Sequence, residues 1–518
     1  MAGEPYYITT PIYYVNDVPH VGHAYATLAS DAIARFMRLD GRDVFFLTGT
    51  DEHGQKVEQA AKTAGIAPQA LADRNSERFR ALARDMGYTN DDFIRTTEDR
   101  HARAVQHLWS VLAERGEIYL GKYAGWYSVR DEAFFAEKEL IKGPGGKLLA
   151  PTGTGAEVEW VEEPSYFFRL SAWGDRLLAF YDAHPDFIAP ESRRNEVVSF
   201  VKGGLQDLSI SRTTFTWGVP VPGDPAHIMY VWIDALTNYL TALGYPDTEA
   251  PKYKRFWPAD VHIVGKDILR FHAVYWPAFL LGAGIAPPKR IFAHGWWTNE
   301  GQKISKSLGN AIDPYDLVAK YGRDQLRYFL LREMPFGNDG DFSRAAMVQR
   351  VNGDLANGIG NLAQRTLTLI QKNCGAAVPK AGALSDDDRA LVNGAAGLLP
   401  MLRDHMNRQE FHKALQAILA MVSEADSYID ANAPWALRKT DPTRMATVLY
   451  VLAETIRNLA IVLQPFVPDA AAKILDQLAI AQDAREFANL GEAYALVPGT
   501  SLPAPRGVFP RLEAEPAV

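Results

Sequence analysis

Two histidines stand where a strand-like segment gives way to a helical one. His20 and His23 lie in PHVGH (19–23), three residues apart and therefore on one face of a helix near its start. Gly22 lets a ligand approach the backbone, and the backbone N–H groups of a helix N-terminus attract anions. This combination predicts a phosphate-binding site. The alternative is a pair of unrelated surface histidines.

A second segment rich in cations comes later in the chain. KISKS (303–307) carries Lys303, Ser305 and Lys306 between two glycines that suggest mobility. Its lysines suit the negative charge that develops on a leaving pyrophosphate. The alternative is a solvated basic loop with no role in chemistry.

The elements around the histidines predict a parallel sheet. The run 6–14 is rich in Tyr, Ile and Thr and predicts a strand, 21–39 has helical spacing of its apolar residues, and 43–50 predicts a short buried strand. A strand–helix–strand unit of this length is a βαβ unit, whose ligands bind at the carboxyl ends of the strands. Two further helices are expected before residue 115. Sheet strands are expected again at 229–236 and 261–268.

The spacing of apolar residues changes from one part of the chain to the next. It predicts a Rossmann-like α/β catalytic domain to which two further parts are joined. An α+β connective module is inserted into the catalytic domain, and an all-α bundle follows it. The predicted parts are the first half of the catalytic domain (1–115), the inserted module (116–225), the second half (226–292), a linking segment with the KISKS loop (293–345), the helical domain (346–497) and an extended tail (498–518).

Composition narrows the class of protein. The chain has 518 residues and a net charge of −8, which argues against indiscriminate nucleic-acid binding but leaves room for a local basic surface. Cys374 is the sole cysteine, which excludes an intramolecular disulfide and a cysteine-rich zinc site. The apolar stretch 448–467 contains Glu454, Arg457 and Pro465, and predicts a buried helix and no membrane span. The N-terminus shows no signal pattern, so we expect a cytoplasmic, multidomain enzyme.

The two cationic segments together resemble the paired HIGH and KMSKS signatures of class I aminoacyl-tRNA synthetases. Over nearly its full length the chain resembles the methionyl-tRNA synthetase family, which implies ligation of L-methionine to tRNA(Met) through methionyl-adenylate. The segments that carry the resemblance are TPIYYVNDVPHVGH (10–23), TGTDEHGQK (48–56), GLQDLSISR (204–212), YVWIDAL (230–236), HIVGKDILRFH (262–272), HGWW (294–297) and APW (433–435).

The resemblance implies a methionine pocket of aromatic and aliphatic side chains. Its expected members are Ile12, Tyr14, Trp232, Ala235, Leu236, Tyr239, Ile268 and His272. Such walls suit an uncharged thioether, and Tyr239 and His272 can add a weak polar contact to the sulfur. Asp51 is expected to hold the α-ammonium group. Ordinary core packing at helical spacing is the alternative for Trp232, Tyr239, Ile268 and His272.

ATP is expected with Mg²⁺ as its companion ion. His20 and His23 are assigned to its α-phosphate, Lys303 and Lys306 to its β- and γ-phosphates, and Gly265 and Asp267 to adenosine. Gly22 and Ser305 are also expected to bind ATP. A rival interpretation groups Asp51, Glu52, His53, His20 and His23 as a metal-hydrolase site. It is disfavoured because the sequence has no HxxxH or HExxH helix.

The inserted module departs from many members of the family. These carry CxxC pairs that bind zinc, whereas 126–140 contains no cysteine. We therefore expect no structural zinc, and a knuckle held by packing of Trp126, Phe134 and Phe135. No oligonucleotide-binding extension follows Arg511, so a monomer is expected.

The helical domain is expected to read the anticodon of tRNA(Met), including the initiator tRNA. The resemblance carries over to Asn361, Arg365 and Trp435, and flipped bases are read by stacking on Trp or Arg and by hydrogen bonds from Asn or Arg. The alternatives are that Asn361 caps a helix and that Trp435 anchors the bundle.

Other classes of protein fit the sequence less well. The cysteine enzyme of this class would need zinc-binding cysteines, and the leucine, isoleucine and valine enzymes carry a larger inserted editing domain. A small-molecule nucleotidylyltransferase would not need the long helical part. A non-catalytic tRNA-binding protein would not need both phosphate motifs.

Overall fold

The computed structural model describes residues 3–16, 18–131, 133–152, 154–303 and 312–513. Its contacts divide the chain into two compact units. We call Pro5–Pro19 with Phe45–His294 the sheet unit, and Met1–Glu4, His20–Val44 and Gly295–Val518 the helical unit.

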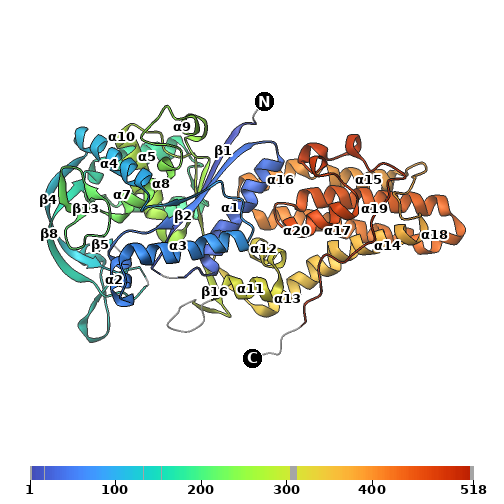
Figure 1. Ribbon diagram of the computed structural model, residues 1–518, viewed down its shortest axis with the longest axis horizontal. Helices are drawn as coiled ribbons and strands as arrows, with labels where there is room; N and C mark the ends of the chain where they lie inside the picture. The colour runs from blue at the N-terminus through green and yellow to red at the C-terminus, as the bar shows by residue number, and fades with distance from the viewer. Residues whose placement is uncertain (1–2, 17, 132, 153, 304–311, 514–518) are drawn as a thin grey trace. The chain divides into compact units, whose positions relative to one another are not determined.

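A parallel sheet forms the centre of the sheet unit (Figure 1). Among the described residues its strand order is β3-β2-β1-β14-β15-β9, and the pairs β1·β14, β14·β15, β15·β9 and β2·β3 are parallel. The strands are β1 (Pro5–Tyr14), β2 (Asp43–Asp51), β3 (Asp92–Arg95), β9 (Ile188–Ala189), β14 (Val261–Gly265) and β15 (Ile291–His294). All residues of β14 and β15 are buried, as expected of a sheet covered on both faces. The strand predicted at 6–14 is confirmed.

Helices and turns separate these strands. The helices of the sheet unit are α2 (Gln55–Ala64), α3 (Pro68–Asp85), α4 (Asp99–Glu114), α5 (Gly174–Ala183), α6 (Glu191–Lys202), α7 (Val231–Leu236), α8 (Asn238–Thr241), α9 (Pro251–Phe256) and α10 (Trp276–Ala283). The sequence predicted two helices before residue 115, but the structure has α2, α3, β3 and α4 there. The apolar part of β3 is only Phe93 and Ile94, too short a run to mark a strand by its pattern.

The strand predicted at 229–236 is wrong. The chain leaves strand β13 (Asp224–Met229) and enters helix α7 at Val231. Every residue of α7 is buried, so the helix has no polar face and its sequence shows no helical period. The segment 261–268 is a strand only as far as Gly265, after which a 3₁₀ turn, η4 (Lys266–Ile268), begins.

The inserted module is built on an antiparallel sheet in the order β10-β8-β4-β5. Its strands are β4 (Ile118–Ser128), β5 (Ala133–Phe135), β8 (Glu159–Phe168) and β10 (Leu208–Ser209). The smaller strands are β6 (Ile141–Lys142), β7 (Leu148–Leu149), β11 (Ser211–Arg212), β12 (Pro220–Val221) and β13. Long pairing of β4 with β8 gives the module its frame.

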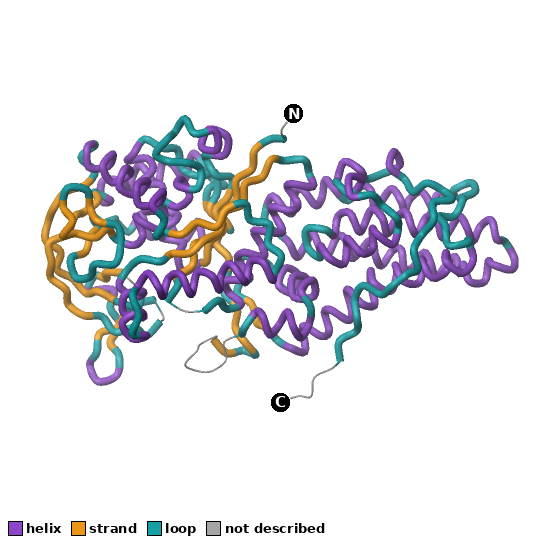
Figure 2. The backbone as a smooth tube through the Cα atoms, viewed as in Figure 1, coloured by secondary structure: helices purple, strands orange, loops and turns teal. Residues whose placement is uncertain are grey.

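The helical unit is mostly helix and loop, as Figure 2 shows. Its helices are α1 (Val21–Leu39), α11 (Pro314–Tyr321), α12 (Arg323–Arg332), α13 (Arg344–Arg350), the π-helical η7 (Val351–Gly360), α14 (Asn361–Asn373), α15 (Asp386–Ala396), α16 (Leu399–Asn407), α17 (Phe411–Asn432), α18 (Pro434–Thr440), α19 (Pro442–Leu463) and α20 (Pro468–Gln477). Helix α1 has the bounds that its apolar spacing predicted. A small sheet, β17-β16-β18, joins Gln302–Lys303, Trp297–Asn299 and Gly340–Phe342.

Helix α19 forms the core of the bundle. It contacts α14, α15, α17, α18 and α20, and Asp441 caps its start by accepting a hydrogen bond from the Arg444 N–H. The helix is long and apolar enough to cross a membrane, but 89% of its most apolar window is buried inside the protein. Its apolar surface is therefore used by the bundle. The tail runs over the bundle, where Asn352 exchanges two hydrogen bonds with the backbone of Leu512.

Candidate active site

His20 and His23 cap the start of α1 with their side chains. His20 is the N-cap residue, and its Nδ1 accepts a hydrogen bond from the Gly22 N–H at 3.1 Å. His23 Nδ1 accepts one from the His20 N–H, also at 3.1 Å. The two rings lie 3.8 Å apart between centroids. A side chain at Gly22 would meet the His20 ring at 2.9 Å, so this close fold of the ring requires glycine.

These hydrogen bonds select the tautomer of both rings. Because each Nδ1 accepts from a backbone N–H, the proton of a neutral ring sits on Nε2 and makes that atom a donor. Burial, followed by the charge of His20, holds the pKa of His23 well below its ordinary value. A neutral His23 therefore offers an N–H donor, at a helix N-terminus that already favours anions.

The hairpin before the KISKS loop positions its first lysine. Strand β17 ends at Lys303, paired with Thr298 of β16, and Thr298 and the Gly301 N–H both donate to the Asp341 carboxylate. After the loop, the carbonyl of Ile312 accepts from the Val21 N–H in the first turn of α1. The chain that follows the KISKS loop thus adjoins the histidine segment within the helical unit. Ser305 and Lys306 lie outside the described residues.

The structure brings the predicted methionine-pocket residues into one region of the sheet unit. Ile12 and Tyr14 lie on β1, and Asp51 ends β2. The remaining members come from α7, α8, the 3₁₀ turn η4 and the π-helix η5 (Phe271–Tyr275). Ile12, Tyr14 and Ile268 are half-buried, whereas Asp51, Trp232, Ala235, Leu236, Tyr239 and His272 are buried. The Trp232 ring stacks on Phe271 with centroids 3.8 Å apart and planes at 7°. This stack makes a flat aromatic wall.

A neutral polar pair lies among these apolar residues. His272 Nδ1 is 3.0 Å from the carbonyl of Ile268, which can only accept, so Nδ1 carries the proton. The hydroxyl of Tyr239 then donates to His272 Nε2 at 2.8 Å. Burial is the main cause that lowers the pKa of His272 to about 4. The pair therefore offers a polar contact without a charge.

The side chains of Glu52 and His53, which follow Asp51, contact other side chains of the protein. Arg95 donates two hydrogen bonds to the Glu52 carboxylate, at 2.7 and 2.9 Å, and His53 Nδ1 lies 2.7 Å from Asp234. These contacts speak against the metal-hydrolase interpretation, because they use the carboxylate and imidazole that it needs. In the part of the chain that the structure describes, no three His, Cys, Asp or Glu side chains are grouped to hold a metal ion.

Gly265 and Asp267 lie together at the carboxyl end of β14. A side chain at Gly265 would collide with the Asp267 carboxylate, so glycine allows this carboxylate to fold back against the strand end. Ligands of parallel sheets bind at this edge. The position suits the adenosine role expected of both residues.

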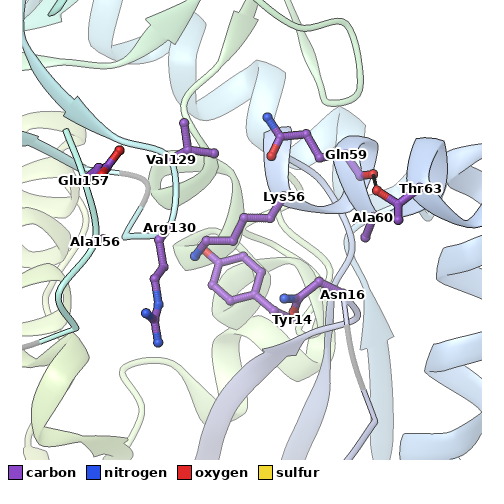
Figure 3. Close-up of a pocket in the computed structure, with 10 residues that line it drawn as sticks. All are labelled: Tyr14, Asn16, Lys56, Gln59, Ala60, Thr63, Val129, Arg130, Ala156 and Glu157. Atoms are coloured by element: carbon purple, nitrogen blue, oxygen red, sulfur yellow. Dashed lines mark hydrogen bonds between the residues drawn. The ribbon is translucent and has the colours of Figure 1, made fainter. Parts of the chain in front are cut away.

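An open pocket of about 700 Å³ lies beside Tyr14 in the sheet unit (Figure 3). It is lined by Tyr14, Asn16, Lys56, Gln59, Ala60, Thr63, Val129, Arg130, Ala156 and Glu157. The Lys56 ammonium lies 4.6 Å from the centre of the Tyr14 ring, and Arg130 enters from the inserted module. Two cations beside an aromatic ring suit an anionic, nucleotide-like ligand.

The knuckle segment has a small core of its own. Phe135, Ala150 and Ala156 are buried together, and the Trp126 ring meets Trp160 edge-on at 5.3 Å. Asp131 ties the turn by accepting from Ser128 at 2.6 Å and from Thr154 at 3.3 Å. These contacts hold the segment 126–140 together through packing and hydrogen bonds. The side chain of Phe134 lies outside the described residues.

The expected anticodon residues lie on neighbouring helices of the bundle. Trp435 on α18 is 48% exposed, and the Arg365 guanidinium on α14 lies 5.6 Å from its ring centre. Arg365 also donates to Asp430 at 2.9 Å. Asn361 is exposed, and no capping hydrogen bond from its side chain is observed among the described residues. The exposure contradicts the alternative in which Trp435 is a buried anchor of the bundle.

Sequence reasoning missed residues that support the pocket. Phe271, which stacks on Trp232, and His101 and Asp234, which are fully buried, were not singled out. Phe271 and Asp234 lie in the segments 262–272 and 230–236, but only their neighbours there had an assigned role. His101 is far from both segments in sequence, and the sequence gives no signal for its pairing with Asp234.

Comparison with protein families places the chain in a class. The family described as "tRNA synthetases class I (M)" matches residues 6–159 and 147–367, and "Anticodon binding domain of methionyl tRNA ligase" matches 378–517. The parallel sheet, the histidine segment and the helical part thus define a class I aminoacyl-tRNA synthetase.

Several similar proteins are methionine-specific members of this class. The methionine–tRNA ligases of Mesorhizobium japonicum and Rickettsia felis are 59% and 56% identical, with alignments that cover 100% and 98% of this chain and 99% of each relative. Methionyl-tRNA synthetase of Mycobacterium tuberculosis, solved with methionyl-adenylate, matches with a TM-score of 0.96 at 55% identity over 98% of this chain and 100% of that one. The chain belongs to the methionine–tRNA ligase family, whose reaction is the ATP-dependent ligation of L-methionine to tRNA(Met) through methionyl-adenylate.

Proposed function

We propose that the residues described above divide the two steps of methionine–tRNA ligation among them. In the first step the methionine carboxylate attacks the α-phosphate of ATP in line, and pyrophosphate leaves. The carboxylate is already ionised, so the step needs no general base. Catalysis then consists of positioning and of stabilising the charge on the phosphates.

The phosphate roles follow from which atoms can donate. His20 and His23, with Nδ1 held by backbone N–H groups, donate from Nε2 to the α-phosphate. Lys303 and Lys306 act on the β- and γ-phosphates, with Ser305 beside them, and Gly22 keeps the backbone accessible. Gly265 and Asp267 border the adenosine. Mg²⁺ enters with ATP as part of that substrate.

The observation that carries the choice of methionine is the neutral Tyr239–His272 pair within an apolar wall. A thioether is uncharged and polarisable, so aromatic faces and one uncharged donor or acceptor suit it better than any ion. Trp232, Ala235, Leu236, Ile12, Tyr14 and Ile268 supply the walls. Asp51, at the carboxyl end of β2, pairs with the α-ammonium group.

In the second step the terminal adenosine of tRNA takes the methionyl group on its 2′-hydroxyl. The pocket beside Tyr14 supports entry of the tRNA end there, because Lys56 and Arg130 bring positive charge to an open surface. Asn361, Arg365 and Trp435 read the anticodon of elongator and initiator tRNA(Met). We further propose that the enzyme works in the cytoplasm as a monomer with the domain division given above.

Tyr239→Phe tests the methionine assignment. It removes the hydroxyl that donates to His272 and leaves Nε2 unsatisfied, so the KM for methionine in ATP–pyrophosphate exchange should rise roughly tenfold while the KM for ATP stays unchanged. Tyr245→Phe, which alters another buried tyrosine of the same unit, is the matched control. A methionine KM that is equal in both variants would refute the pocket.

A further inference from the structure

A buried carboxylate joins two imidazoles that are far apart in sequence. Asp234 Oδ2 lies 2.7 Å from His53 Nδ1, and Asp234 Oδ1 lies 2.8 Å from His101 Nε2. Asp234 and His101 have no exposed surface, and His53 is 8% exposed. Each carboxylate oxygen thus has its own imidazole partner, and both contacts lie within the sheet unit.

The two imidazoles come from different elements of the sheet unit. His53 follows Asp51 by two residues, in the turn that leaves β2. This turn is also held from its other side, because the Trp217 indole donates to the Glu52 carbonyl at 2.6 Å and the Gly54 N–H donates to the Trp217 carbonyl at 3.0 Å. His101 lies on α4, and its Nδ1 is 3.1 Å from the Thr241 hydroxyl on α8.

Asp234 itself lies inside the methionine-pocket helix. It lies between Trp232 and Ala235 on α7, so one short buried helix carries the carboxylate and both pocket residues. Burial acts to raise the pKa of Asp234, but the charge of His53 and the hydrogen bonds from both imidazoles outweigh it and lower the pKa to about 2. The carboxylate is therefore ionised at neutral pH, and ionised hydrogen bonds are shorter and stronger than neutral ones.

We propose that Asp234 is a positioning residue for methionine, which sets the separation between Asp51 and the α7 wall by holding His53 on one side and His101 on the other. The inference rests on the methionine pocket proposed above. Methionine must meet an ammonium partner at one end and an aromatic wall at the other, and displacements of about 1 Å in such sites are costly. Asp234 touches no substrate and acts through the turn at 51–54 and through its own helix.

Asp234→Asn is the direct test, because it keeps the shape of the side chain and removes one acceptor and the charge. The KM for methionine in ATP–pyrophosphate exchange should rise about tenfold or more, with the KM for ATP within about twofold of the wild-type value. His53→Gln, which removes the imidazole that contacts both Asp234 and the Trp217 ring, should raise the methionine KM in the same direction. It also keeps the proposal testable if Asp234→Asn fails to fold.

A matched control comes from the helical unit. Asp388 is a buried carboxylate held by Arg444 and Tyr428, so Asp388→Asn should lower the thermal midpoint without changing the methionine KM. The double variant Asp234→Asn/His53→Gln should raise the KM little more than the larger single effect, because both changes break one linkage.

The outcomes separate the possible failures. An unchanged methionine KM in a folded Asp234→Asn protein would overturn the positioning role. The positioning role would also be overturned if the KM values for methionine and ATP rose equally and the thermal midpoint fell in parallel, because general destabilisation produces this result. If the wild-type chain shows no methionine-dependent exchange, the proposed pocket itself fails, which is a different result.

Discussion

The orientation of single rings decides what the histidines of this protein can do. PHVGH predicted a phosphate-binding arrangement from residue types and spacing, and the structure places the two rings 3.8 Å apart. Sequence could not show that both Nδ1 atoms accept from backbone N–H groups, because that depends on side-chain rotamers and on the N-cap geometry of His20. The same holds for His272, whose acceptor role follows only from its contact with the Ile268 carbonyl.

Burial of His272 leads to a prediction about pH. Its pKa is about 4 in the folded protein against an ordinary value of 6.5, so between these pH values the unfolded chain binds a proton that the folded chain does not. Stability should therefore fall as the pH drops through this window. Protonation of His272 in the unfolded chain should lower the free energy of unfolding by about 2 kcal/mol at a pH of about 5.

Urea unfolding at neutral and at mildly acidic pH checks this prediction. The loss of unfolding free energy on acidification should be smaller in His272→Gln than in the wild type, because the variant has no imidazole to titrate. Half-buried His23 and buried His262, whose pKa values desolvation also lowers, should leave part of the pH dependence in place. An equal loss in both proteins would show that His272 does not titrate in this way.

At the scale of elements, prediction succeeded where the helix or strand was long. Helix α1 and strands β1 and β2 were predicted from periodicity and from buried apolar runs. Helix α7 was mistaken for a strand because its residues are buried on every side. An apolar run of that length fits either element, and packing of Trp232 on Phe271 is a tertiary contact that the local sequence does not encode.

The knuckle segment leads to a prediction about zinc. Hydrophobic packing around Phe135 and the hydrogen bonds of Asp131 hold the segment 126–140, and that segment has no cysteine. Purified protein should therefore contain no stoichiometric zinc. After dialysis against a chelator and restoration of Mg²⁺, exchange activity and thermal midpoint should equal those of untreated protein. Detection by elemental analysis of one tightly bound zinc per chain would contradict this account of the knuckle.

At the scale of the whole molecule, two tasks are assigned to different parts of the chain. The families matched over 6–367 and 378–517 are a class I synthetase family and an anticodon-binding family, and the division into catalytic, inserted and helical parts stays a prediction. That division was readable because each part has its own composition and periodicity. The contact between Arg365 and Trp435 could not be predicted from the sequence. Helices α14 and α18 are separated by about 60 residues and meet only after the bundle folds.

Trp435→Ala should separate the two tasks. The indole is 48% exposed, so its removal leaves no buried cavity and the thermal midpoint should stay near that of the wild type. Loss of stacking on an anticodon base should weaken tRNA binding by roughly 1–3 kcal/mol. Methionine-dependent exchange needs no tRNA and should be unchanged. Tyr494→Ala, an exposed aromatic change in the same unit, is the control, and equal tRNA binding by the two variants would remove Trp435 from the anticodon site.

We expect the neutral, aromatic pocket of the sheet unit to select methionine for activation. Amino-acid-dependent ATP–pyrophosphate exchange, measured with each proteinogenic amino acid in turn, tests it most directly. Exchange should be rapid with L-methionine and slight with leucine, isoleucine, valine or cysteine, because only the thioether matches both the apolar walls and the Tyr239–His272 pair. Equal or faster exchange with any other amino acid, or none with methionine, would contradict it.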